Sequence, residues 1–166
     1  VLIGTQTWMA KNLNYNANGS ICYDNNSGSC NTYGRLYDLA TAKIVCPPGW
    51  HLPSDSEWTT LVNYAESNSG CTGCAGTKLK AMNDWSSGNG TDDYGFSALP
   101  GGFGLFNGNS GVGNFGYWWS AKDYDANSAY SRHMGYSAVS RNNRTVSRSN
   151  RNKSELFSVR CLQDNH

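Results

Sequence analysis

Large and small side chains alternate along residues 130–138, which is the period of a β-strand with one buried face. The large set comprises Tyr130, Arg132, Met134, Tyr136 and Ala138, and the opposite set comprises Ser131, His133, Gly135 and Ser137. Further short strands are predicted at 145–148 and at 156–162, the latter with Phe157, Val159 and Cys161 pointing inward. Together these strands predict a twisted antiparallel sheet whose outer face is polar and carries the small set.

Apolar segments at 117–120 and 157–161 bracket this polar stretch, and they are typical of core strands. At least one of Trp118 and Trp119 is therefore expected to be buried. Six of the seven arginines fall in this part of the chain: Arg132, Arg141, Arg144, Arg148, Arg151 and Arg160. They fit either a solvated strand face or a surface for an acidic partner, and the sequence leaves both open.

Two helices are predicted from apolar periodicity. One covers 35–45 and ends at Cys46-Pro47-Pro48-Gly49; the other follows Ser54, which forms a capping box with Glu57. The apolar stripe of the first helix is Leu36, Leu39, Ala40 and Ile44, and that of the second is Trp58, Leu61, Val62 and Ala65. This assigns Glu57 to a helix cap rather than to acid catalysis.

The remaining segments predict little regular structure. Residues 1–14 favour two short strands, and 14–31 read as a loop rich in Asn, Gly and Ser. Residues 67–116 are rich in glycine and show no extended periodicity, but their aromatic residues indicate a packed loop. The chain is thus predicted to be a single α+β domain over 1–166, with two helices, long Gly-rich loops, and 117–161 as its ligand-facing region.

The composition and net charge of the chain limit the kinds of molecule that it is expected to bind. Only 15% of the residues are charged and the net charge is +1, which gives no general attraction to nucleic acid or to a membrane surface. The longest apolar runs are well below the ~20 residues of a membrane span. We therefore expect a soluble chain without membrane contact, from which an export signal or anchor could have been removed.

The six cysteines indicate an oxidising compartment, either secreted or at the cell surface, including the outer membrane or a phage particle. Six cysteines allow fifteen pairings. The spacing favours two local pairs, Cys22 with Cys30 and Cys71 with Cys74, which leaves Cys46 for Cys161. The CxxC at 71–74 is also compatible with a redox pair or half of a zinc site, but no second CxxC is present.

Five separated motifs resemble the Fibrobacter succinogenes major paralogous domain: 3–13 (IGTQTWMAKNL), 46–53 (CPPGWHLP), 95–102 (GFSALPGG), 117–120 (YWWS) and 157–161 (FSVRC). The resemblance runs over nearly the whole chain. It implies a C-type-lectin-like fold related to formylglycine-generating enzymes. Those relatives act through cysteines, and since all six cysteines here have plausible partners, we expect no enzymatic activity.

Metal binding is a separate question for a lectin-like fold. The sequence contains neither EF-hand spacing nor the Glu-Pro-Asn and Trp-Asn-Asp motifs of sugar-binding C-type lectins. No cofactor is therefore expected. A structural calcium ion at Asp92 or Asp93 remains an alternative, and His51 is expected to be structural.

The tail also resembles the variable region of proteins diversified by a retroelement, in which changes at template adenines convert Asn codons into codons for Ser, Gly, Asp, His, Arg, Thr or Tyr. An ordinary polar strand is the alternative. The candidate ligand-binding residues are Asp125, Ser128, Ser131, His133, Gly135, Ser137, Ser140, Asn142, Asn143, Arg144, Ser147 and Ser149, with Trp119 and Tyr136 as aromatic neighbours. The expected function is a ligand-binding or adhesion module for a protein or glycan; a non-diversified carbohydrate-binding or structural adhesion domain is the alternative.

Overall fold

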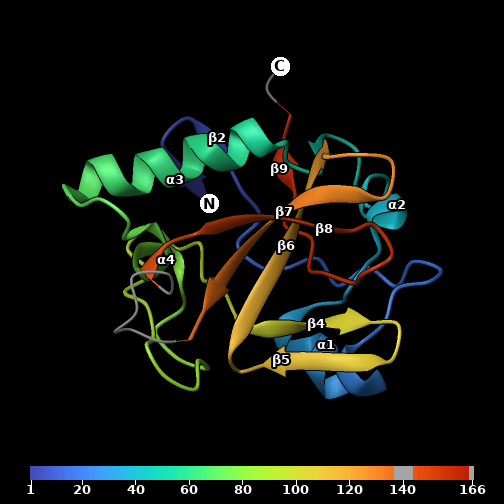
Figure 1. The fold of residues 1–166 in the computed structure, drawn as a ribbon. Coiled ribbons are helices and arrows are strands. Elements are labelled where there is room, and N and C mark those ends of the chain that lie inside the picture. Colours follow the sequence, from blue (N-terminus) through green and yellow to red (C-terminus); the bar gives the residue numbers. More distant parts are fainter. Residues whose placement is uncertain (137–143, 165–166) are drawn as a thin grey trace.

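The computed structural model describes residues 1–136 and 144–164, which form a mixed α+β domain (Figure 1). The helical elements are η1 (Tyr23–Asn25), α1 (Ser27–Tyr33), α2 (Leu39–Ala42), α3 (Asp55–Ser69) and α4 (Ala75–Leu79). The strands are β1 (Leu2–Ile3), β2 (Gln6–Thr7), β3 (Trp50–His51), β4 (Gly101–Leu105), β5 (Gly108–Val112), β6 (Phe115–Asp123), β7 (Ser128–Gly135), β8 (Ser147–Asn152) and β9 (Leu162–Gln163).

The main sheet has five strands in the order β5-β4-β6-β7-β8. Its pairs are antiparallel except for β4 and β6, which run parallel where Gly102 lies beside Gly116. Residues 156–158 then pair with both strands, because Leu156 bridges Gly104 and Ser158 bridges Trp118. As Figure 1 shows, the β4–β5 hairpin lies at one end of the molecule and α3 crosses above the sheet at the other.

Helix α3 covers one face of this sheet. It begins at the predicted capping box, in which the Glu57 amide donates to Ser54 Oγ and the Ser54 amide donates to Glu57 Oε2. Trp58 of this helix packs against Trp8 and Trp118, with ring centroids 4.9 and 6.4 Å apart, and all three side chains are fully buried. Buried aromatic groups of this size supply much of the hydrophobic stabilisation of a small domain.

A second hydrophobic cluster covers the opposite face of the sheet. Trp119 donates from Nε1 to the carbonyl of Tyr37 at 2.8 Å, and its ring centroid lies 4.4 Å from that of Phe157. Ala129 of β7 belongs to the same cluster. The middle of β6 and β7 is therefore enclosed between two apolar layers.

A buried polar network joins the first segment of the chain to the last. Arg160 is completely buried and donates from Nε and Nη2 to Asn12 Oδ1, at 3.0 and 2.7 Å. The same oxygen accepts from Trp118 Nε1 at 2.8 Å, and Asn12 Nδ2 donates to the carbonyl of Tyr33. Burial lowers the pKa of Arg160 to about 9, so the guanidinium remains charged at neutral pH.

Three disulfides confirm the predicted pairs, Cys22–Cys30, Cys46–Cys161 and Cys71–Cys74. The second spans 115 positions and ties the segment after α2 to the last strand region. The first and third close local loops, at α1 and between α3 and α4.

His51 ties the end of the described chain to α3, as expected for a structural residue. Its Nδ1 lies 2.6 Å from Asp164 Oδ1, and its Nε2 lies 3.0 Å from Glu57 Oε1. Burial alone would lower the pKa of His51, but the hydrogen bonds from its ring to Asp164 and Glu57 outweigh that effect and raise the pKa above 6.5.

This arrangement gives a pH-dependent contribution to stability. Because the pKa of His51 is higher in the folded state, the contribution is fully present below pH 6.5 and is lost as the pH rises through the folded value. The side chains are about one third exposed, so we expect a loss of only ~0.5–1 kcal/mol. The difference in Tm between the wild type and His51→Gln should be larger at pH 5.5 than at pH 8.5. A difference that stays constant with pH would contradict this role.

Several predicted elements need correction. The helix predicted at 35–45 shrinks to Leu39–Ala42, because Leu36 and Tyr37 bridge Ile21 and Phe157 in extended conformation and Asp38 caps the helix through the Thr41 amide. The predicted loops at 14–31 and 67–116 contain α1, α4, β4 and β5, so the description with two helices was wrong. The two N-terminal strands are confirmed, and the predicted strand at 156–162 forms only isolated bridges and β9.

Candidate ligand-binding face

The register of β6, β7 and β8 places short polar side chains and one histidine on a single surface. Tyr117 lies opposite His133, and His133 lies opposite Ser147 on its other side. Ser131 lies opposite Ser149, and their hydroxyl oxygens are 3.3 Å apart. We call the accessible part of this surface the serine–histidine face and define it as Tyr117, His133, Ser147, Ser149 and Arg151.

His133 lies at the centre of the serine–histidine face. Its half-buried ring stacks on Tyr117, with centroids 4.9 Å apart and planes 19° apart. Burial lowers its pKa, and the nearby positive charge of Arg151 lowers it further, so the imidazole is neutral at pH 7. Within residues 1–136 and 144–164, no group forms a hydrogen bond with Nδ1. This nitrogen is buried, so its unused hydrogen-bonding capacity faces the protein interior rather than solvent.

Arg151 closes one side of the face. Its Nε donates to Glu155 Oε2 at 2.7 Å, which holds the guanidinium 5.5 Å from the ring centroid of Tyr117 and 5.8 Å from that of Phe103. Cation–π contacts of this kind restrain an arginine without burying it. Tyr117 is also stacked on Phe157, so its ring presents an edge rather than a face to solvent.

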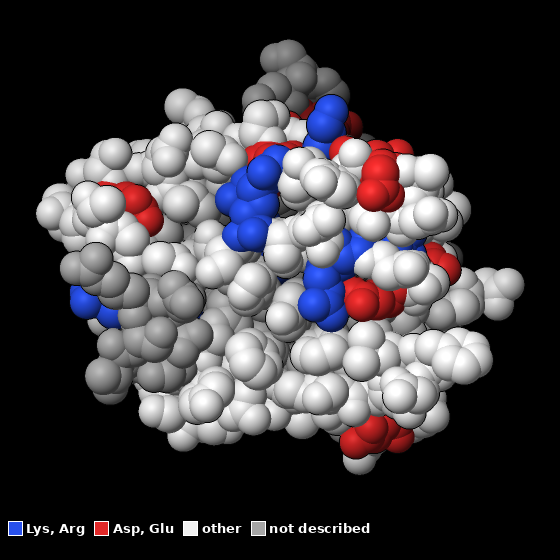
Figure 2. Space-filling model, viewed as in Figure 1, with Lys and Arg blue, Asp and Glu red and all other residues white. Residues whose placement is uncertain are grey.

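A charged cluster anchors the other side of β7 and β8 to α3. Asp55 accepts from Arg132 Nη2 at 2.7 Å and forms an ion pair with Arg148 Nε at 2.9 Å. Burial would raise the pKa of Asp55, but hydrogen bonds from Arg148 and Arg132 prevail and lower it. Arg148 also stacks on Tyr130, 3.5 Å from the ring centroid. Figure 2 shows the molecule from the same side as Figure 1. Groups of Lys and Arg side chains are separated there by largely uncharged surface.

The predicted site residues fall into four groups: half-exposed, exposed, outside the described part of the chain, and buried. His133, Ser147 and Ser149 are half-exposed on the serine–histidine face, and Ser128 is half-exposed at the start of β7. Asp125 and Arg144 are exposed but lie beyond opposite ends of the β7–β8 ladder. Tyr136 is 40% exposed and forms an edge contact with Phe115. Four predicted residues lie outside the described part of the chain: Ser137, Ser140, Asn142 and Asn143.

Other predicted positions are buried, contrary to expectation. Ser131 and Trp119 have 0% exposure, and Gly135 is also buried. The predicted alternation of strand residues was correct. The prediction that all the small side chains face solvent was wrong. The reason is that β7 is an inner strand, and at Ser131 the apolar cluster around Trp119 and Ala129 covers the face that was expected to be exposed. Trp118 is buried as well, so both members of the Trp pair belong to the core.

Tyr117, Arg151 and Glu155 belong to this region, but sequence reasoning did not select them as site residues. The parity of β8 places Arg151 on the same face as Ser147 and Ser149, and Glu155 follows Arg151 by four positions, so a local signal was present. Tyr117 was predicted only as part of a core strand.

The calcium candidates are both engaged by protein groups. Asp92 accepts from the amide and the hydroxyl of Ser97, and Asp93 forms an ion pair with Lys78 at 2.8 Å. In the described residues, no group of three or more His, Cys, Asp or Glu side chains is arranged to hold a metal ion.

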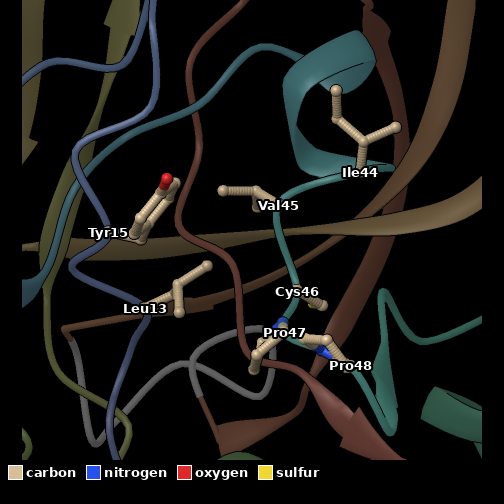
Figure 3. A pocket seen from close by; sticks show the side chains of 7 residues that line it. All are labelled: Leu13, Tyr15, Ile44, Val45, Cys46, Pro47 and Pro48. Carbon is tan, nitrogen blue, oxygen red and sulfur yellow. The ribbon is translucent and has the colours of Figure 1, made fainter.

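A separate hollow of about 400 Å³ lies beside the Cys46–Cys161 bridge and is mainly apolar (Figure 3). Val45 points across it toward Leu13 and Tyr15, whereas Ile44 points away. Ile44 and Tyr15 are largely exposed. This hollow shares no residue with the serine–histidine face.

These features define an α+β domain with a disulfide-tied scaffold and a polar surface beside an edge strand. The chain belongs to the family described as the Fibrobacter succinogenes major domain, whose model matches residues 1–163. No curated protein and no solved structure matches the chain. None of the helices described here is long and apolar enough to cross a bilayer.

Proposed function

We propose that the chain is a ligand-binding module of a bacterial secreted or cell-surface protein and that it recognises a protein or glycan through the serine–histidine face. The observation that carries this proposal is the continuity of half-exposed His133, Ser147 and Ser149 across β7 and β8. Serine side chains on an ordered strand lose little conformational entropy when a ligand docks. Such a surface favours recognition by hydrogen bonds.

The scaffold supports the same proposal. All six cysteines are paired, so a mechanism of the formylglycine-generating type would first require reduction of a disulfide. Three disulfides suit an extracellular location. The bridge between Trp8 and Leu162 brings the two ends of the described chain together, which supports a C-type-lectin-like arrangement.

We further propose that a retroelement diversifies exposed positions of this tail. Ser147, Ser149, Asp125 and Arg144 can accept different side chains without disturbing the core, because they are exposed or half-exposed. Ser131 is fully buried and is expected to remain small. A near-copy of the coding sequence for this region, differing only at adenines and lying beside a reverse-transcriptase gene, would support diversification.

The alternative is a carbohydrate-binding or structural adhesion domain without diversification. Tyr124 favours this alternative, because its ring is 55% exposed and makes only an edge contact with Tyr130. A sugar ring could stack on such a surface. Absence of an adenine-variant copy from the neighbouring DNA would favour it.

The binding face can be tested with matched substitutions on one strand. Ser149→Glu alters the serine–histidine face, whereas Asn150→Glu adds the same charge to the next residue, which points to the opposite side of β8. On an array of glycans and surface proteins, we expect Ser149→Glu to weaken the wild-type signal at least tenfold and Asn150→Glu to preserve it. Both variants should keep the wild-type circular dichroism spectrum. Equal binding by both would exclude this face.

A further inference from the structure

A pocket of about 520 Å³ with a mixed polar and apolar lining lies away from the serine–histidine face, between the segment around Asn12, the end of α1 and residues 97–99. Its side-chain lining includes Lys11, Asn14, Asn31, Thr32 and Tyr33. The volume falls within the range of small-molecule sites. We call it the Tyr33 pocket.

The walls of the Tyr33 pocket are fixed by close packing and hydrogen bonds. Gly34 has a φ of +79°, and a Cβ atom there would lie 2.8 Å from the carbonyl oxygen of Leu13. The Arg35 amide donates to this same carbonyl, and Asn12 Nδ2 donates to the Tyr33 carbonyl at 2.9 Å. The Cys22–Cys30 disulfide holds α1 in place. The backbone of the pocket is therefore fixed before any ligand arrives, whereas the side chains of Lys11, Asn14, Asn31 and Thr32 are exposed at its rim.

The electrostatic character of the Tyr33 pocket favours an anion. Among the described residues that line the pocket, Lys11 is the one with a charged side chain. Arg160 lies behind Asn12 and Ser97, to whose side-chain and carbonyl oxygens it donates, and the nearby Asp92 carboxylate offsets part of its charge. Asp84 is close enough to contribute to the raised pKa of Tyr33, after burial, but it does not line the pocket.

The polar groups of the pocket match the functional groups of a sugar acid. The amides of Asn14 and Asn31 can each donate and accept hydrogen bonds, as sugar hydroxyls require. The Thr32 hydroxyl donates to the Gly28 carbonyl and can still accept a hydrogen bond from a ligand. The ring of Tyr33 offers an apolar surface for the C–H groups of a pyranose. We propose that the Tyr33 pocket binds one uronic acid residue of an acidic saccharide, with Lys11 pairing with its carboxylate. This proposal does not depend on the serine–histidine face.

The test uses the intact disulfide-bonded protein and two pairs of probes, oligomers of galacturonic acid against oligomers of galactose, and oligomers of glucuronic acid against oligomers of glucose. In ¹⁵N-¹H NMR titrations, we expect an acidic oligomer to shift the amides of Lys11, Thr32, Tyr33 and Ser97 and to bind at least tenfold more tightly than its neutral counterpart.

Two lysine variants provide the matched comparison. Lys11→Gln should weaken binding of the acidic oligomer about tenfold, whereas Lys122→Gln removes an exposed lysine from β6 and should leave binding unchanged. Thr32→Ala should also weaken binding. Equal affinities of the two lysine variants, shifts confined to β7 and β8, or absence of shifts with both acidic oligomers at millimolar concentration would overturn the proposal. These results would leave the separate proposal of ligand binding at the serine–histidine face standing.

Discussion

Replacement of Asn12 by alanine is expected to lower the free energy of unfolding by about 3–5 kcal/mol. The substitution removes the oxygen that accepts from Trp118 Nε1 and from two nitrogens of the fully buried Arg160. A buried cation that loses its main acceptor cannot recover those hydrogen bonds from water. Urea unfolding monitored by tryptophan fluorescence would measure the loss.

Asn14→Ala is the matched control for this experiment, because Asn14 lies two positions further along the chain and is exposed. It should change the free energy of unfolding by less than about 0.5 kcal/mol. Similar losses in both variants would show that Asn12 has no special role in holding Arg160.

Removal of the Cys46–Cys161 bridge by a double replacement with serine is expected to cost about 5 kcal/mol. The bridge closes a loop with a separation of 115 positions, and the entropy of the unfolded chain rises strongly when such a loop opens. The variant should unfold at a much lower urea concentration than the oxidised wild type.

The Cys71–Cys74 bridge provides the comparison, since its separation is only 3. The same chain-entropy model gives about 2 kcal/mol for the double replacement of these two cysteines. Equal losses for the two bridges would mean that loop entropy does not control their contribution. Both measurements require that the remaining cysteines stay oxidised.

Features that depend on neighbouring residues in the chain could be predicted from the sequence. The capping box of Ser54 and Glu57 and the first and third disulfides involve groups within a few positions of one another. The long disulfide followed once the local pairs had been assigned. The buried positions of Phe157, Val159 and Cys161 were also predicted, since they alternate in an apolar segment.

Features that depend on distant segments could not be predicted in the same way. The alternation of large and small residues in β7 predicted a strand, but it did not show which segments cover each face of that strand. Ser131 and Gly135 were therefore expected at the surface. Leu36 has helical spacing relative to Leu39 and Ala40. However, the bridges from Leu36 to Ile21 and from Tyr37 to Phe157 hold this segment extended. Apolar periodicity also fails to predict β4 and β5, because each strand contains at least two glycines, which carry no side chain to show the pattern.

The long disulfide determines which part of the chain bears a mechanical load. When tension is applied at the two ends of the described chain, the force passes through the covalent bond between Cys46 and Cys161. The segment between these cysteines contains α3 and β4 to β8, and it is shielded from the load. The serine–histidine face therefore keeps its shape under traction, while only the chain outside the bridge can extend.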